Sequence, residues 1–215
     1  MATRTKRTRR RVKTCPEHTA KHRDPSLLRK DYYCEIGALH VEGKHANQNH
    51  LSEMQESLGN FPRCLRGGVA LEIGCGVSPY ARAIEESGWL YDGLDASPWA
   101  VNWMQAHGHS RTFVGDWACW KVQFQRGLIV AAHVIEHLPD APGAIAKMAT
   151  WLKPGGELWI IVPDDTDRCN PDHLWTFTEG TLRSVIERTG LAIEQIVIRQ
   201  IVKRERFIYA KARKL

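Results

Sequence analysis

The sequence lacks any run of apolar residues as long as the roughly 18 to 20 that a membrane helix needs. Its Arg-rich beginning is not followed by the apolar core of a signal peptide either. The six cysteines form no Cys-x-x-Cys pair and are spread over 215 residues, which excludes the disulfide framework of a small secreted domain. We therefore expect a cytoplasmic protein with reduced thiols and no membrane span.

The composition is that of a globular protein. Hydrophobic residues make up 43% of the chain and charged residues 25%, which excludes wholesale disorder and collagen-like sequences. A length of 215 residues suits one domain of ordinary size with a short appendage.

Positive charge is concentrated at the beginning of the chain. Residues 1–30 hold eleven Lys or Arg against Glu17 and Asp24, so the rest of the chain is slightly acidic although the net charge is +6. We expect residues 1–23 to form a basic, disordered arm that contacts polyanions in a salt-dependent way. A tail that only increases solubility would explain the same charge.

Two further segments follow the arm. Residues 24–66 are predicted to be an N-terminal extension with a small helical lid, because four residues are spaced as one face of a helix. Residues 67–215 alternate short β-rich runs with amphipathic stretches, which predicts βα units and a parallel sheet covered on both faces. The helical face consists of Leu51, Met54, Gln55 and Leu58.

The fold predicted for residues 67–215 is an α/β, Rossmann-like, doubly wound sheet of seven strands. The last two strands have too few residues between them for a parallel crossover, so they should pair as an antiparallel hairpin. Each of three helices should begin at a capping side chain that precedes a proline. The predicted strands are 69–73, 90–94, 112–114, 128–132, 157–162, 192–199 and 203–211; the caps are Ser78, Ser97 and Asp140; helix ends are expected at Gly88, Gly108, 154–156 and Gly190.

A glycine turn follows the first predicted strand. Gly74-Cys75-Gly76 would let the backbone approach a ligand, and Asp95 ends the next strand, where the hydroxyls of a ribose would lie. A dinucleotide site would also need a third glycine, but Pro79 stands at that position. Glu72 adds negative charge beside the turn, which disfavours a pyrophosphate and favours a ligand with an ammonium or sulfonium group.

From about Val69 to its end, the chain resembles the class I S-adenosylmethionine-dependent methyltransferases, especially those that act on small molecules and glycans. Five stretches carry the resemblance, in order and at ordinary spacing. They are Leu71–Gly76, Gly93–Ser97, Val114–Asp116, Ala132–Leu138 and Leu152–Leu158. The resemblance implies a seven-stranded sheet whose last strand is antiparallel.

The resemblance also implies roles for individual residues. Glu72, Gly74 and Gly76 would line the methionine part of S-adenosylmethionine, and Asp95 would bind its ribose. Asp116 and Trp117 would hold the adenine, and His133 would lie under the sulfonium. Cys75 and Ala96 fall within the same stretches and are counted among the cofactor contacts.

Catalytic candidates are few, because methyl transfer from a sulfonium mainly requires that donor and acceptor are held in line and that water is excluded. Few groups of the enzyme have to react covalently. His133 ends a central strand, and His173 follows the fifth strand in a segment expected to face the acceptor. Alternatively, His173 makes a buried hydrogen bond that orders a loop, and the sequence is equally consistent with this role. Glu136 and His137 are interpreted as structural, and no basic neighbour in the sequence would activate Cys75 as a nucleophile.

No metal is expected. Four residues near the beginning of the chain could in principle supply zinc ligands, but their spacing matches none of the usual paired forms. These residues are Cys15, His18, His22 and Cys34.

The sequence therefore predicts a methyltransferase that moves a methyl group from S-adenosylmethionine to an O or N atom of a small-molecule, sugar or glycan acceptor. The fourth predicted strand ends in Ala131-Ala132-His133-Val134. This is not the Asn- or Asp-Pro-Pro-aromatic signature of enzymes that methylate exocyclic amines of DNA bases, and no Pro-Cys follows as in cytosine C5 enzymes, so methylation of nucleic-acid bases is disfavoured. Two alternatives stay open: a non-catalytic module that binds an adenosyl ligand or nucleic acid, and an NAD-dependent oxidoreductase, which Pro79 and Glu72 disfavour.

Overall fold

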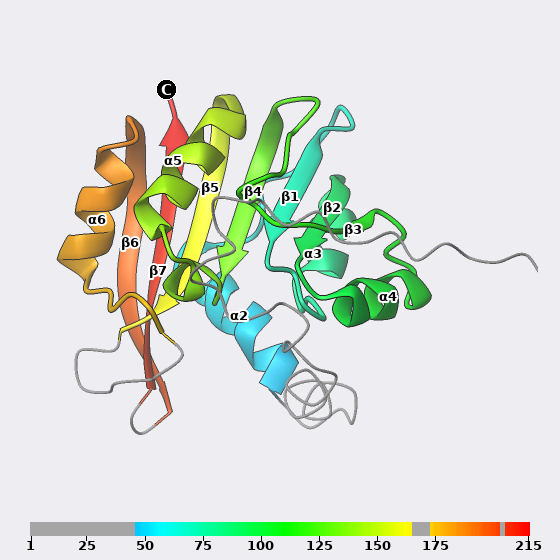
Figure 1. Cartoon of the computed structure of the whole chain (residues 1–215). Coiled ribbons are helices and arrows are strands. Elements are labelled where there is room, and N and C mark those ends of the chain that lie inside the picture. The colour runs from blue at the N-terminus through cyan, green and yellow to red at the C-terminus, as the bar shows by residue number, and fades with distance from the viewer. Residues whose placement is uncertain (1–45, 165–172, 203–204) are drawn as a thin grey trace, which may run out of the picture.

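The computed structural model describes residues 46–164, 173–202 and 205–215. They form a seven-stranded sheet in the order β3-β2-β1-β4-β5-β7-β6, with helices on both faces (Figure 1). The predicted doubly wound α/β fold is confirmed. The predicted basic arm, and the part of the predicted lid that precedes residue 46, lie outside the described residues, as do the four zinc-ligand candidates near the beginning of the chain.

Five parallel strands form most of the sheet. β1 (Val69–Ile73) pairs with β2 (Leu90–Asp95) on one side and with β4 (Arg126–Ala132) on the other. Beyond them, β3 (Thr112–Val114) pairs with β2, and β5 (Leu152–Pro163) pairs with β4. The strand order reverses between β1 and β4, and in open α/β sheets ligands bind outside the carboxyl ends of the strands at such a point.

The last two strands form the predicted hairpin. β6 (Leu191–Val202) pairs antiparallel with β7 (Glu205–Lys214). β7 lies between β5 and β6 and is antiparallel to both, so it joins the hairpin to the parallel strands.

Two hydrophobic clusters lie on opposite faces of the sheet. On one face, α5 (Ala141–Trp151) and α6 (Glu179–Glu187) pack on inward-facing side chains such as Ile129. On the other, α2 (Ala46–Leu58), α3 (Ala81–Glu86) and α4 (Pro98–Ala106) pack on side chains such as Val130. Successive strand residues therefore point to opposite faces, and both faces are covered.

The helix predicted from the spacing of Leu51, Met54, Gln55 and Leu58 corresponds to α2. Met54 has no exposed surface and Leu58 is nearly as buried. Polar contacts fasten the helix to the hairpin: the Gln195 side chain donates to the carbonyl of Ser57, and Arg199 donates to the carbonyl of Glu56 at 2.7 Å and to its carboxylate at 3.3 Å. α2 is thus fixed to the sheet; its role as a lid stays a prediction.

Two of the three predicted helix starts are confirmed. Ser97 Oγ accepts from the amide of Ala100 at 3.3 Å, and Asp140 Oδ1 accepts from the amide of Gly143 at 2.9 Å. The start predicted at Ser78 is wrong, because α3 begins only at Ala81.

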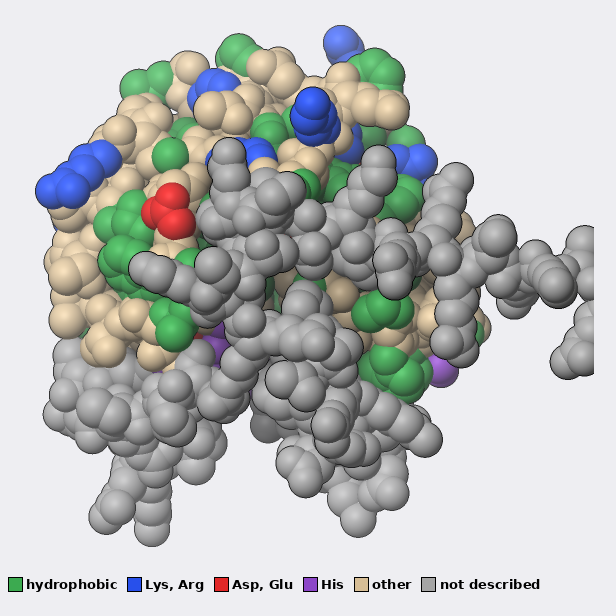
Figure 2. Space-filling view, viewed as in Figure 1, with side chains coloured by type: hydrophobic (Ala, Val, Ile, Leu, Met, Phe, Trp, Pro, Cys, Tyr) green, Lys and Arg blue, Asp and Glu red, His purple; other side chains and the backbone are tan. Residues whose placement is uncertain are grey.

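No helix in the described part of the chain is long and apolar enough to cross a membrane. The face that carries α5 and α6 has its Lys and Arg side chains mainly near the upper rim, where the parallel strands begin (Figure 2). Histidine side chains reach the surface lower down, toward the carboxyl ends of these strands (Figure 2).

Candidate active site

The glycine turn follows β1 directly. Gly74 and Gly76 have φ angles of 65° and 50°, in the left-handed region that glycine adopts without strain. The amides of Gly74 and Cys75 both donate to the carbonyl of Leu94 in β2, at 2.8 and 3.2 Å. A Cβ atom at Gly74 would lie 2.5 Å from Cγ2 of Val134, so the turn is packed tightly against the segment that follows β4.

Asp95 braces this turn from the end of β2. Its Oδ2 accepts from the amide of Gly76 at 2.8 Å, and its Oδ1 accepts from the amide of Ser97 at 2.7 Å. The residue is only 5% exposed, while the neighbouring Ala96 is partly exposed. A carboxylate has about four lone-pair sites, so each of its oxygens can accept from more than one donor.

Glu72 lies beneath the turn and is 3% exposed. Its Oε2 accepts from the hydroxyls of Ser78 and Tyr91, each at 2.6 Å. Burial raises the pKa of this carboxyl to about 7; the two hydrogen bonds oppose the rise and the nearby charge of Asp95 adds to it. Glu72 is therefore held by the protein interior, and a direct contact with a cofactor stays a prediction.

The raised pKa of Glu72 predicts a specific dependence of stability on pH. Because the folded protein holds this proton up to about pH 7 while the unfolded chain releases it near 4.5, the stability contributed by Glu72 is full at low pH. It falls as the pH rises between these values, by about 3 kcal/mol in total. Glu72→Gln should remove this component, as measured by urea unfolding at about pH 5 and about pH 8.

Other groups titrate in the same range, so the informative quantity is the difference between wild type and Glu72→Gln at each pH. Glu86→Gln, at an exposed position of α3, is the matched control. An equal difference at both pH values would show that Glu72 does not titrate as described.

Cys75 is 4% exposed. Burial, followed by the charges of Asp95 and Glu72, raises the pKa of its thiol well above the usual value. The thiol is therefore protonated at neutral pH, which agrees with its exclusion as a nucleophile.

Asp116 and Trp117 follow β3. The amide of Gly115 donates to the carbonyl of Asp95 at 2.9 Å, which holds this turn beside the end of β2. Asp116 Oδ1 accepts from the amide of Ala118 at 2.9 Å, and both side chains are partly exposed. A hollow of about 580 Å³ opens next to this turn, toward α5 rather than toward the glycine turn. It is lined by Ala118, Cys119, Trp120, Lys121, Val122, Lys147 and Trp151.

His133 follows β4 at the point where the strand order reverses. Among the described residues it is the one non-glycine with a positive φ, 53°, a conformation that costs roughly 1 to 2 kcal/mol. Its amide donates to the carbonyl of Ile161 at 2.9 Å. Its ring lies edge-on to Phe207, with ring centroids 4.9 Å apart, and to His50 of α2, with centroids 5.5 Å apart.

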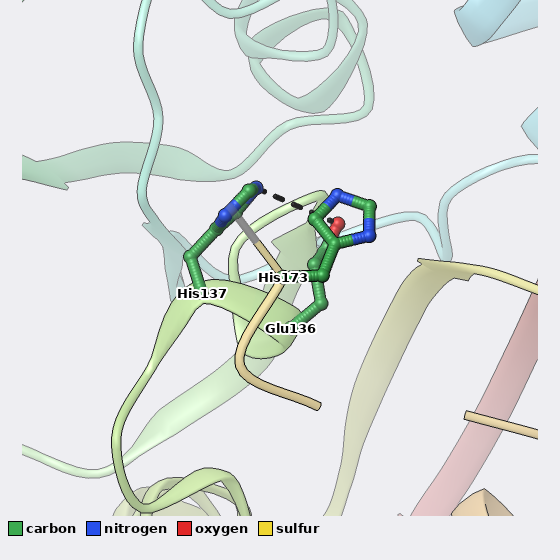
Figure 3. Close-up of side chains that lie close together, drawn as sticks. All are labelled: Glu136, His137 and His173. Carbon is green, nitrogen blue, oxygen red and sulfur yellow. Dashed lines mark ion pairs between the residues drawn. The ribbon is translucent and has the colours of Figure 1, made fainter. Parts of the chain in front are cut away.

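Glu136, His137 and His173 form a cluster (Figure 3). His133 is next to it, with Nδ1 3.7 Å from Glu136 Oε1. His137 Nε2 lies 4.0 Å from Glu136 Oε1, and the rings of His137 and His173 are 4.8 Å apart and nearly perpendicular. The amides of Leu174 and Trp175 donate to the carbonyl of Glu136, which fixes the His173 segment to the 3₁₀ helix η2 (Ile135–His137).

The structure thus brings the predicted residues into two neighbouring groups. Gly74, Gly76 and Asp95 lie at the ends of β1 and β2, and His133 lies at the end of β4, joined to them by Val134. Glu136 and His137, interpreted from the sequence as structural, lie together with His173. His50 was not singled out, since nothing in the sequence connects α2 to the end of β4.

A sheet of this order, with a glycine turn and an acidic residue at its switch point, defines the class I S-adenosylmethionine-dependent methyltransferase fold. The family model described as a methyltransferase domain matches residues 45–196. The chain belongs to this methyltransferase family.

Similar proteins agree with this assignment. A ubiquinone biosynthesis O-methyltransferase of Coxiella burnetii is 27% identical over 102 residues, which cover 45% of this chain and 44% of that protein. The match thus spans less than half the length of this curated relative. A magnesium protoporphyrin IX methyltransferase from Synechocystis, solved with bound S-adenosylhomocysteine, superposes with a TM-score of 0.67 at 16% identity and covers 89% of this chain and all of its own. A TehB-like methyltransferase from Corynebacterium glutamicum gives a TM-score of 0.65 at 21% identity, with coverages of 89% and 100%.

Proposed function

We propose that this enzyme transfers a methyl group from S-adenosylmethionine to an oxygen or nitrogen atom of a small-molecule, sugar or glycan acceptor. One observation carries the proposal: the glycine turn, Asp95 and His133 meet at the switch point of a sheet that belongs to the methyltransferase family. The name of the curated relatives, O-methyltransferase, favours oxygen as the acceptor atom.

The residues at the switch point fit the cofactor. Asp95 is proposed to accept from the ribose hydroxyls, while the partly exposed Ala96, Asp116 and Trp117 contact the adenine. Gly74, Cys75 and Gly76 are proposed to contact the methionine part through their backbone, and Glu72 to support the turn through Ser78. S-adenosylmethionine would supply an electrophilic methyl group on a sulfonium.

The residues around the end of β4 are proposed to hold the acceptor. His133 and His173 are partly exposed, and both lie within the group of side chains that surrounds Glu136. They are proposed to contact the acceptor and keep it in line with the methyl group. The basic residues at the beginning of the chain are proposed to add contact with polyanions, on the strength of their charge alone.

Calorimetric titration of the purified chain with S-adenosylmethionine, S-adenosylhomocysteine and NAD tests the cofactor. We expect a dissociation constant in the micromolar range for the adenosyl ligands, equivalent to about 8 kcal/mol at 1 μM, and no saturable binding of NAD. Saturable NAD binding without a response to either adenosyl ligand would overturn the proposal. A screen of acceptors by mass spectrometry then identifies the methylated product; cofactor binding that is never followed by transfer would favour a non-catalytic module.

A further inference from the structure

Glu136 is a buried carboxylate that receives no hydrogen bond from the described residues. Its side chain is 1% exposed, and neither Oε1 nor Oε2 has a hydrogen-bond partner in the part of the chain that the structure describes. Its neighbours His133 and His137 approach Oε1 at 3.7 and 4.0 Å, which is beyond hydrogen-bond distance. A buried carboxylate left in this state is costly unless a cation compensates it.

The imidazoles of His137 and His173 lie close to this carboxylate. One ligand atom from each, together with a carboxylate oxygen of Glu136, lie within 4.8 Å of one another (Figure 3). The rings meet nearly at right angles, at 74°, so they do not stack. Figure 3 shows that they come from separate segments of the chain that converge on Glu136.

We propose that Glu136, His137 and His173 bind a divalent transition-metal ion of the Zn²⁺ type. Two imidazole nitrogens and one carboxylate oxygen are donors that Zn²⁺ and its neighbours in the first row accept, whereas Mg²⁺ and Ca²⁺ prefer oxygen donors alone. One carboxylate and two neutral imidazoles leave a net charge of about +1 on the bound ion and at least one open coordination position.

The cluster has to contract slightly to hold an ion. With Zn–N and Zn–O distances of about 2.0 to 2.1 Å, two ligand atoms in a tetrahedral site lie about 3.3 Å apart. The separations here reach 4.8 Å, so each side chain would move by roughly 1 Å, which small rotations of the imidazole rings supply. Both histidines are partly exposed, which gives an ion and a further ligand access to the site.

The place of the site in the fold indicates which ligand would occupy the open coordination position. Glu136 lies three residues after His133, in the region proposed to hold the acceptor, and this part of the inference rests on the proposed function. A bound ion would attract an acceptor hydroxyl oxygen, lower the pKa of that hydroxyl and orient the oxygen. The acceptor class that fits is therefore an alcohol or phenol that methylation converts to an ether. The new O–C bond would form as the S–C bond of the sulfonium breaks, S-adenosylhomocysteine would leave, and the hydroxyl proton would pass to solvent or buffer.

Metal binding is tested on the full chain by equilibrium dialysis with Zn²⁺ after removal of metals by a chelator. We expect one equivalent to be bound, and Glu136→Gln and His173→Ala each to lower its affinity about 100-fold or more, since even outer-shell changes cost 10- to 100-fold. His107→Ala, at an exposed histidine after α4, is the matched control and should bind like wild type. Glu136→Gln removes the charge and keeps the side-chain volume, and circular dichroism establishes that each variant is folded.

Co²⁺ in place of Zn²⁺ distinguishes this site from one that uses cysteines. Nitrogen and oxygen ligands give d–d bands alone, whereas a thiolate adds a sulfur-to-metal charge-transfer band. A charge-transfer band would assign the metal to cysteines and overturn the proposal. Absence of bound metal, or a bound equivalent that survives both substitutions, would overturn it too.

Titration of the same variants with S-adenosylmethionine separates the two proposals. We expect Glu136→Gln to bind the cofactor like wild type while it loses the metal. A protein that binds Zn²⁺ at this site but not the cofactor would refute the proposed function and leave the metal site standing. A protein that binds the cofactor but no metal would refute the metal site and leave the proposed function standing.

Discussion

Replacing Asp95 with alanine is expected to weaken S-adenosylmethionine binding roughly 10- to 150-fold, which corresponds to the 1.5 to 3 kcal/mol of charged hydrogen bonds. The same change should lower the free energy of unfolding by about 2 to 4 kcal/mol, because the amides of Gly76 and Ser97 lose their acceptor. Calorimetry measures the first effect and urea unfolding the second.

Two further substitutions separate these effects. Asp95→Asn keeps one oxygen as an acceptor but removes the charge. It should therefore lose most of the affinity for S-adenosylmethionine, but less of the free energy of unfolding than Asp95→Ala does. Asp140→Ala removes the carboxylate that caps α5 through Gly143, so it should cost about 0.5 to 2 kcal/mol of stability without changing the affinity. Unchanged affinity in folded Asp95→Ala would show that Asp95 does not bind the ribose.

Replacing Gly74 with alanine is expected to lower the free energy of unfolding by about 3 to 5 kcal/mol. The new Cβ would lie 2.5 Å from Val134 Cγ2, and the φ of 65° adds roughly 1 to 2 kcal/mol of backbone strain. Because Val134 is adjacent to His133, relief of the clash would also displace the end of β4, so cofactor affinity should fall together with stability.

Gly59→Ala isolates the strain. Gly59 has a φ of 84°, but a Cβ added there would have nothing within 4 Å. Gly59→Ala should therefore lower the free energy of unfolding only by the roughly 1 to 2 kcal/mol that the backbone conformation costs. Val134→Ala in the Gly74→Ala background should restore part of the lost stability, as a double-mutant cycle measures. If Gly74→Ala costs no more than Gly59→Ala, the clash with Val134 does not limit this position.

The strands could be predicted because their signal is local. Runs of β-branched and apolar residues between turn residues gave the bounds of β1 and β3 as the structure has them, Val69–Ile73 and Thr112–Val114. β5 was predicted to begin at Glu157, but it begins at Leu152, because Leu152 pairs with Arg126. The residues predicted to end a helix, 154–156, lie within this strand as an irregularity opposite β4.

Ser78 shows how a local signal can be correct in chemistry and wrong in position. Its hydroxyl accepts from the amides of Tyr80 and Ala81, each at 3.0 Å, as a capping residue would. It also donates to Glu72 of β1, and α3 begins three residues later, at Ala81. The partner comes from the sheet, so capping rules alone could not place the start.

The candidate site was predictable only where its residues share a motif. Gly74, Gly76 and Asp95 lie within two short stretches, and the bond between Gly76 and Asp95 joins them. His173 was named as a catalytic candidate from the sequence, but its place beside His137 was not, because the tertiary bonds from the segment after it to the carbonyl of Glu136 bring the two together. The spacing of residues along the chain does not indicate those bonds.

The position of β7 governs the order in which the sheet can be completed. β7 follows β6 in the chain but lies between β5 and β6 in the sheet. During synthesis, α6 and β6 therefore emerge before the strand that attaches them, and the edge of β5 stays open until β7 inserts. Such late, non-local pairing slows folding and leaves an edge available for pairing with other chains. We infer that the nascent chain is most prone to aggregation in the interval between synthesis of β5 and synthesis of β7.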